Sequence, residues 1–332
     1  MNYDIFNGDA DGIISLLQLR LANPIESELV TGVKRDINLL SKLVDKVELA
    51  KGDKLTVLDI SMEKNQAGLV CALDGEIDVF YADHHRTGDI AVSKHLDAHI
   101  DLDANTCTAL IVDGVLNGEY HYWAITAAYG DNLIAKGDQL SKVAGLPVEQ
   151  SEQLKELGTL INYNGYGAVV EDLHFHPAKL YMALLKYPSP FDVIADNSSP
   201  FYRLQSAYQE DMDNALAIQA EYRSDVVSAF ELPNEPWARR ISGVYGNQLA
   251  NQNPNSAHAV LTENRDGTYT ASLRAPLSNK QGAGDICSQF ETGGGRAAAA
   301  GINALPKEQI ADFIKAVEAF YHVGPTSAGK DF

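Results

Sequence analysis

The chain has 332 residues, which is too long for one ordinary domain and indicates two. It carries 26 basic and 45 acidic residues, a formal net charge of −19. This balance argues against a protein that tracks along a long nucleic acid, because such proteins need a basic surface. We interpret most of the acidic excess as solubilising surface, and expect any phosphorylated substrate to be small and held by local cations.

Neither a membrane span nor a signal-peptide core is present in the sequence, so we expect no membrane partner. Three cysteines, Cys71, Cys107 and Cys287, occur singly, without the spacing of a metal site or a disulfide framework. We therefore expect reduced, mostly buried thiols and a cytoplasmic location.

The first half of the chain alternates short apolar runs with helical stretches. Strands are predicted at residues 3–6, 29–33, 55–60 and 77–81, and helices at residues 13–21, 37–47, 65–73, 109–116 and 122–129. Alternation at this pitch predicts an α/β domain with a parallel sheet and helices on both faces.

The second half has a different texture. Breaks at residues 188–190 and 197–200 mark a seam, and residues 202–227 form a long helical stretch that we interpret as a connector. Further on, strands are predicted at residues 241–245, 257–261 and 269–273, and an amphipathic helix at residues 309–321. The predicted domains are thus residues 1–195, a connector at 196–228, and a smaller α+β domain at 229–332.

Acidic residues and histidines follow several of these runs directly. Taken singly, each has a simple explanation as a turn residue, a helix cap or a core histidine. Open α/β sheets, however, bind ligands at the carboxyl ends of their strands, and buried carboxylates gathered there repel one another unless cations neutralise them. The sequence therefore predicts a metal site built from Asn7, Asp9, Asp11, Asp59, Asp83, His84, His85 and Asp131.

A glycine run near the C-terminus, Gly293, Gly294 and Gly295, precedes Arg296 and a stretch of alanines. Three glycines allow backbone N–H groups to approach an anion, and the alanines could begin a helix whose positive end faces that anion. The alternative is a flexible turn before a tightly packed helix. Arg274, in a predicted strand, is either a phosphate-binding cation or an exposed strand charge.

Taken in order, these motifs resemble those of the DHH phosphoesterases. The stretch Asn7-Gly8-Asp9-Ala10-Asp11-Gly12, then Asp59, Asp83-His84-His85 and Gly130-Asp131, is similar to the four ordered motifs of that family. The glycine run with Arg296, together with Ser272-Leu273-Arg274, is similar to the associated DHHA1 domain. The resemblance covers essentially the whole chain.

This resemblance implies a centre of two Mn²⁺ ions, with Mg²⁺ and Co²⁺ as alternatives. One ion would be bound by Asp9 and Asp59, and the other by Asp11, Asp59, His84 and Asp131, with hydroxide attack on the phosphorus. Asp83 would orient an imidazole, and His85 would contact the phosphate. The substrate would be bound by Arg274, Gly293, Gly294, Gly295 and Arg296.

The sequence departs from the family pattern at three positions. Ile5 stands where relatives that act on small substrates carry a histidine, and its side chain cannot bind a metal. Asn7 stands where exonucleases of the family carry an aspartate, and it offers only an amide oxygen. Arg296 stands where histidine is usual, and its guanidinium retains anion binding.

The function implied is a Mn²⁺-dependent phosphodiesterase that hydrolyses short linear oligonucleotides, above all dinucleotides such as pGpG, to mononucleotides. Two alternatives are a phosphatase for pAp-type 3′-phosphonucleotides and a cyclic-dinucleotide phosphodiesterase. A non-enzymatic alternative is a nucleotide-binding regulator with a decayed centre. The expected partners are short phosphorylated nucleotides rather than long nucleic acid, and base preference and oligomeric state are left open.

Overall fold

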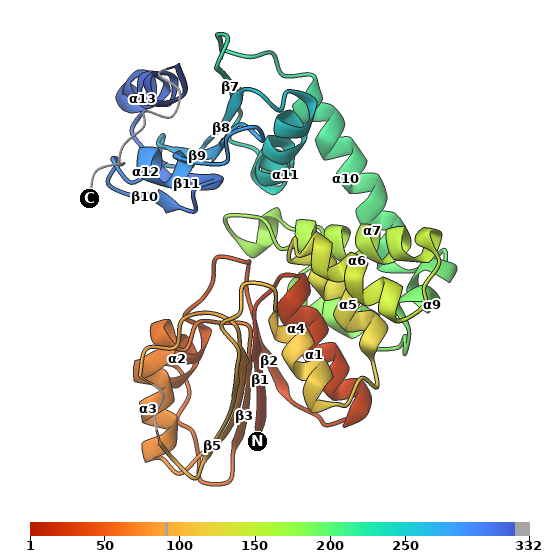
Figure 1. Cartoon of the computed structure of the whole chain (residues 1–332). Helices are drawn as coiled ribbons and strands as arrows, with labels where there is room; N and C mark the ends of the chain where they lie inside the picture. The colour runs from red at the N-terminus through yellow and green to blue at the C-terminus, as the bar shows by residue number, and fades with distance from the viewer. Residues whose placement is uncertain (90–91, 323–332) are drawn as a thin grey trace, which may run out of the picture. The chain divides into compact units, whose positions relative to one another are not determined.

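The computed structural model describes residues 1–89 and 92–322 (Figure 1). Internal contacts divide the chain into two units, residues 1–207 and 208–332, and the division falls within helix α10 (Pro200–Leu216). Each unit has its own sheet and its own core. Among the described residues, no helix combines the length and the apolar character needed to cross a bilayer.

The first unit is built on a parallel sheet in the order β2-β1-β3-β4-β5. Its strands are β1 (Asn2–Phe6), β2 (Glu28–Val30), β3 (Lys54–Leu58), β4 (Asp78–Asp83) and β5 (Leu96–Ile100). Phe6 is aligned with Leu58, and Leu58 with Ala82. The residues that follow these three positions therefore reach the carboxyl edge of the sheet at the same level.

Helices cover both faces of this sheet, as the sequence predicted (Figure 1). One face carries α1 (Ala10–Ala22) and α4 (Thr108–Val115), and the other α2 (Leu39–Val44) and α3 (Gln66–Asp74). Ile5, Val57, Leu40 and Leu69 belong to one apolar cluster between the sheet and α2–α3, where burial of such side chains contributes about 1.5–3 kcal/mol each. The unit continues through α5 (His121–Gly130), α6 (Ile134–Val143), α7 (Val148–Asn164), α8 (Pro177–Leu184) and α9 (Pro190–Ala195).

The second unit is a mixed sheet in the order β10-β11-β9-β8-β7-β6, in which the β7–β8 pair is parallel and the other pairs are antiparallel. Helices α12 and α13 close its apolar core. The elements are β6 (Tyr222–Arg223), β7 (Val227–Leu232), α11 (Pro236–Gln252), β8 (Ala257–Glu263), β9 (Tyr269–Arg274), α12 (Ala283–Cys287), β10 (Gly293–Gly295), β11 (Ala299–Leu305) and α13 (Ile310–His322). The α/β unit followed by a smaller α+β unit agrees with the predicted fold class.

Several sequence predictions about this second half were wrong. Residues 241–245 form part of helix α11 rather than a strand, because Ala238, Ile241, Tyr245 and Leu249 recur at helical spacing and are all buried. The helix predicted over residues 202–227 ends at Leu216, and the chain then enters β6 and β7. In the first half, the prediction omitted β5, which pairs in parallel with β4.

The alanine stretch after the glycine run is also a strand rather than a helix. Strand β11 pairs antiparallel with β9, placing Ala299 opposite Arg274, and with β10, placing Gly294 opposite Gly301. Small residues here allow close strand packing: a Cβ on Gly301 would lie 2.9 Å from the Ala271 carbonyl oxygen. The segment behind the glycines, described throughout residues 296–305, therefore offers no helix N-terminus to an anion.

Candidate metal and phosphate site

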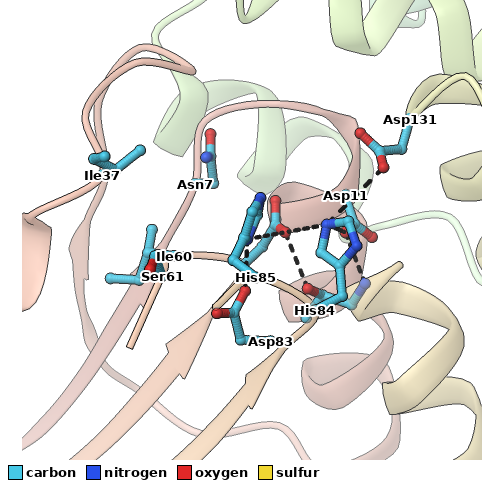
Figure 2. Close-up of polar contacts among 12 residues, drawn as sticks. Asn7, Asp11, Ile37, Ile60, Ser61, Asp83, His84, His85 and Asp131 are labelled. Carbon is cyan, nitrogen blue, oxygen red and sulfur yellow. Dashed lines mark hydrogen bonds and ion pairs between the residues drawn. The ribbon is translucent and has the colours of Figure 1, made fainter. Parts of the chain in front are cut away.

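The carboxyl edge of the first sheet gathers the residues predicted for a metal site. Asp59 follows β3, Asp83 ends β4, and His84 and His85 come next. Asp9 caps α1, its Oδ1 accepting the Gly12 N–H at 3.1 Å, and Asp131 follows the last residue of α5. In Figure 2 the side chains of Asp11, His84 and Asp131 converge from these different elements.

The imidazole nitrogen of His84 lies close to oxygens of three carboxylates in this cluster. His84 Nε2 lies 3.5 Å from Asp59 Oδ1, 3.8 Å from Asp11 Oδ2 and 3.9 Å from Asp131 Oδ2. Metal–ligand bonds of roughly 2.1 Å place neighbouring donor atoms about 3–4 Å apart, and each of these three distances falls in that range. Among the described residues, Asp59, His84 and His85 offer donor atoms that all lie within 4.8 Å of one another. A donor set of three carboxylates and an imidazole suits Mn²⁺, Mg²⁺ and similar divalent ions.

Asp11 is fixed by the start of another helix. Its two carboxylate oxygens accept the backbone N–H groups of Thr108 and Ala109, each at 2.7 Å, at the N-terminus of α4. Thr108 Oγ1 also donates to Asp59 Oδ1 at 3.0 Å. Charge-assisted bonds of this kind orient a ligand before it binds a metal, so α4 holds two of the candidate ligands in position.

Asp59 is both strained and electrostatically crowded. Its backbone is left-handed, with φ of 59°, a conformation that costs a non-glycine residue roughly 1–2 kcal/mol. Burial raises the pKa of Asp59 well above its usual range, and the negative charges of Asp11, Asp9 and Asp131 add to that effect. Such crowding is relieved when a cation binds, so the local charge favours a metal.

The pKa of Asp131 is also raised, although its side chain is more exposed than that of Asp59. Burial raises its pKa to about 6, with the Asp11 and Asp9 charges acting in the same direction and Lys34 opposing them. A cation bound at this edge of the sheet would therefore stabilise the charged form of Asp131 as well.

Asp83 and His85 form a hydrogen-bonded pair next to Asp59, whose Oδ1 lies 3.9 Å from His85 Nδ1. The Asp83 carboxylate is fully buried and its Oδ1 lies 2.7 Å from His85 Nδ1, while its Oδ2 has no hydrogen-bond partner among the described residues. Although burial favours the neutral ring, the hydrogen bond and charge of Asp83 raise the pKa of His85. Asp83 thus fixes the orientation of His85, whose ring is half-exposed and can reach a bound anion.

Three further residues belong to this site although no sequence motif includes them: Lys34, Asn162 and Thr108. Lys34 Nζ donates to Asp9 Oδ2 at 2.6 Å and to Asn162 Oδ1 at 3.1 Å, and lies 3.7 Å from Asp131 Oδ1. Burial opposes the charged amine, but the charges of Asp9, Tyr166 and Asp131 hold the pKa of Lys34 well above its usual range.

The ion pair between Lys34 and Asp9 also shifts the pKa of Asp9. Burial would raise its pKa, but the Lys34 ammonium and the Gly12 N–H outweigh that effect and lower it. One sequence signal could have identified Lys34, because it directly follows the predicted strand at residues 29–33, at the same edge of the sheet as the acidic residues.

Asn7 lies at the margin of the cluster. Its amide nitrogen donates to the Lys34 carbonyl at 3.3 Å, and its buried Oδ1 has no hydrogen-bond partner within the part of the chain that the structure describes. Ile5 is fully buried in the apolar cluster under α2 and α3, so it offers no donor atom.

The predicted substrate-binding residues lie in the second unit. Arg274 ends β9, and its guanidinium donates to Asn247 Oδ1 at 2.6 Å, to Ser272 Oγ at 2.9 Å and to the Gly243 carbonyl at 3.1 Å. These bonds fix the plane of the guanidinium against α11.

The glycine run itself forms an edge strand. Within β10, a Cβ added to Gly294 would meet open space, whereas a Cβ on Gly293 would clash with the Cys287 carbonyl oxygen at 1.8 Å. Gly295 has φ of 144°, which disfavours other residues, and Arg296 is exposed. Gly294 and Arg296 thus lie on the edge strand of the sheet and just after it, whereas Arg274 lies on β9, with β11 between β9 and β10.

Comparison with known proteins agrees with the sequence resemblance. Residues 225–322 match the DHHA1 domain, and no curated protein sequence matches the chain significantly. Among solved structures, the manganese-bound exonuclease RecJ is similar with a TM-score of 0.58 and 14% identity, over 98% of this chain and 90% of that one.

Two further structures have comparable similarity. RecJ from Thermus thermophilus, in complex with Mn²⁺, has a TM-score of 0.58 and 15% identity, covering 98% of this chain and 52% of its own. The pGpG-specific phosphodiesterase PggH from Vibrio cholerae has a TM-score of 0.54 and 14% identity, covering 97% and 99% respectively. At these identities the structural likeness establishes a shared fold.

Proposed function

We propose that the chain is a DHH/DHHA1-family phosphoesterase, and specifically a Mn²⁺-dependent phosphodiesterase for short linear oligonucleotides. Residues 225–322 match the DHHA1 domain and the whole chain shares its fold with RecJ, which supports the proposal. The observation that carries this proposal is the set of three carboxylate oxygens within 3.9 Å of His84 Nε2, whose four residues come from four different strand or helix ends in the first unit. Acidic residues that cluster by chance would not place an imidazole nitrogen at these distances from three carboxylate oxygens.

The residues present have distinct tasks in such a reaction. Asp11, Asp59, His84 and Asp131 would hold a divalent ion, which when bound supplies Lewis acidity to water and to a phosphoryl oxygen. His85, oriented through Nδ1 by Asp83, presents its other ring nitrogen to the phosphate.

In the second unit, we propose that phosphate is bound by Arg274, Gly293, Gly294, Gly295 and Arg296. An arginine fits phosphate oxygens through two parallel N–H bonds.

The preferred substrate class is a linear dinucleotide such as pGpG. The net charge of −19 opposes long polyanions, whose added phosphates would meet a surface of like charge. PggH, which has the same fold, is described as specific for pGpG, and we propose the same class of substrate for this chain.

A substrate panel tests this proposal. The purified chain, with Mn²⁺ and after chelation, would be assayed on pGpG, pApA, RNAs of three, five and ten nucleotides, cyclic dinucleotides and pAp. We expect mononucleotide release from dinucleotides, a kcat/KM that falls with every added nucleotide, and a shallower fall at high salt because screening weakens the repulsion.

The other outcomes separate the alternatives. A flat length profile would favour an exonuclease, and turnover of pAp alone would favour a phosphatase. No turnover of any substrate, with fewer than one ion bound per chain, would favour a decayed centre that only binds nucleotides.

A further inference from the structure

The donor atoms of the centre fall into two groups. The first group is centred on His84, whose Nε2 lies within 3.9 Å of an oxygen of Asp11, Asp59 and Asp131. Asp9, expected to bind a second ion, instead directs Oδ2 at the Lys34 ammonium, 2.6 Å away. A positive charge therefore already lies beside the carboxylate on which a second ion would depend.

Lys34 is built into this position rather than placed there by a flexible surface chain. Its backbone N–H donates to the Gly165 carbonyl at 2.9 Å, and its own carbonyl accepts the Asn7 amide at 3.3 Å. Its Nζ also bonds Asn162 Oδ1 at 3.1 Å and lies 5.6 Å from the centre of the Tyr166 ring. Both the backbone and the ammonium are thus held by the segment that ends α7.

The ammonium also reaches the other group of ligands. Lys34 Nζ lies 3.7 Å from Asp131 Oδ1, while Asp131 Oδ2 faces His84. Asp131 therefore contacts the lysine through one oxygen and faces His84 through the other. A second divalent ion bound to Asp9 would have to lie beside a fixed cation, and like charges at such distances repel strongly.

We propose that this centre binds a single divalent ion, through Asp11, Asp59, His84 and Asp131, and that the Lys34 ammonium paired with Asp9 takes the place of the second ion. The inference rests on the proposed function only in requiring that the chain bind a divalent metal. In this arrangement Lys34 neutralises Asp9 and presents N–H groups at the position where an ion would otherwise contact a phosphoryl oxygen. The centre thus differs from the two-ion site that the sequence resemblance implies.

Metal stoichiometry tests the inference without reference to turnover. The chain would be titrated with Mn²⁺ by calorimetry, the bound metal counted by elemental analysis, and the spin state recorded by electron paramagnetic resonance. We expect one Mn²⁺ per chain and the six-line spectrum of an isolated ion in the wild type. Two bound ions with an exchange-coupled spectrum would overturn the inference while leaving the proposed function standing, and no bound ion would overturn both.

Two variants locate the second cation. Lys34→Gln frees Asp9, so its stoichiometry should rise to two Mn²⁺ per chain, and a value that stays at one would contradict the role given to Lys34. Asp9→Asn should still bind one Mn²⁺ with a Kd within about threefold of the wild type, because Asp9 pairs with lysine. Loss of the ion in this variant would show that Asp9 is a ligand and would refute the proposal even if Lys34→Gln fails to fold.

A matched control removes the same charge elsewhere. Lys42 lies on α2 and pairs with Asp36 at 3.0 Å in an exposed position. Lys42→Gln should leave the stoichiometry at one. A rise to two ions in this variant as well would assign the effect to net charge and refute the specific role of Lys34.

Discussion

Replacing Asp83 by Asn removes a charge from the contact that orients His85 while keeping the shape of the side chain. The Asp83 carboxylate is fully buried and lies 2.7 Å from His85 Nδ1. A hydrogen bond to a charged group contributes about 1.5–3 kcal/mol. If Asp83→Asn removes this whole contribution from the stabilisation of the transition state, kcat/KM falls roughly 10- to 150-fold.

The same substitution should move the titration of His85. The hydrogen bond and charge of Asp83 raise the pKa of His85, so removing the charge should make the ring lose its proton at a lower pH than in the wild type. Imidazole resonances of the metal-free protein, followed by NMR from mildly acidic to mildly basic pH, measure this directly. Activity would be measured on the dinucleotide substrate in parallel.

Strand β4 offers a matched control at its opposite end. Asp78 lies 2.8 Å from His95 Nδ1 in the same kind of contact, but its side chain is 63% exposed. Asp78→Asn should therefore leave kcat/KM unchanged. Wild-type efficiency in Asp83→Asn, or an equal loss in Asp78→Asn, would refute the argument that Asp83 acts by orienting His85.

Three further outcomes are expected. His84→Ala should lower Mn²⁺ affinity and reduce turnover on the order of a thousand-fold, because it removes the imidazole that lies close to all three carboxylates. His99→Ala, at a partly exposed position away from the cluster, should change neither quantity in metal titration and steady-state assays. The pKa of Asp131 is about 6 in the folded chain, above its value in the unfolded chain, so between these two values the folded chain keeps a proton that the unfolded chain has lost. The metal-free protein should therefore lose stability as the pH rises from about 4 to above 6, and thermal melts of Asp131→Asn should not show this loss. Arg274→Ala should lower kcat/KM for the dinucleotide roughly 10- to 100-fold. Mn²⁺ affinity should stay unchanged, because the candidate metal ligands all lie in the first unit. An equal loss of kcat/KM in Arg265→Ala would contradict a specific role of Arg274 in binding the substrate.

The sequence determined most of the first unit because its signals are local. An apolar run followed at once by Asp59, or by Asp83 and His84, shows both the strand and the polar residue at its end. In a parallel sheet such ends meet, and the alignment of Phe6 with Leu58 and of Leu58 with Ala82 confirms that they do. The convergence of these side chains therefore followed from pattern alone.

The tertiary structure decided what depends on contacts between distant residues. Lys34 bonds Asn162, 128 positions later in the chain, and no local pattern connects the two. The alanines behind the glycine run form a strand because β9 supplies backbone partners, overriding alanine's preference for helix. The ammonium beside Asp9 is set by the same kind of long-range packing, so the sequence could indicate a cation site while the fold decided which cation each carboxylate faces.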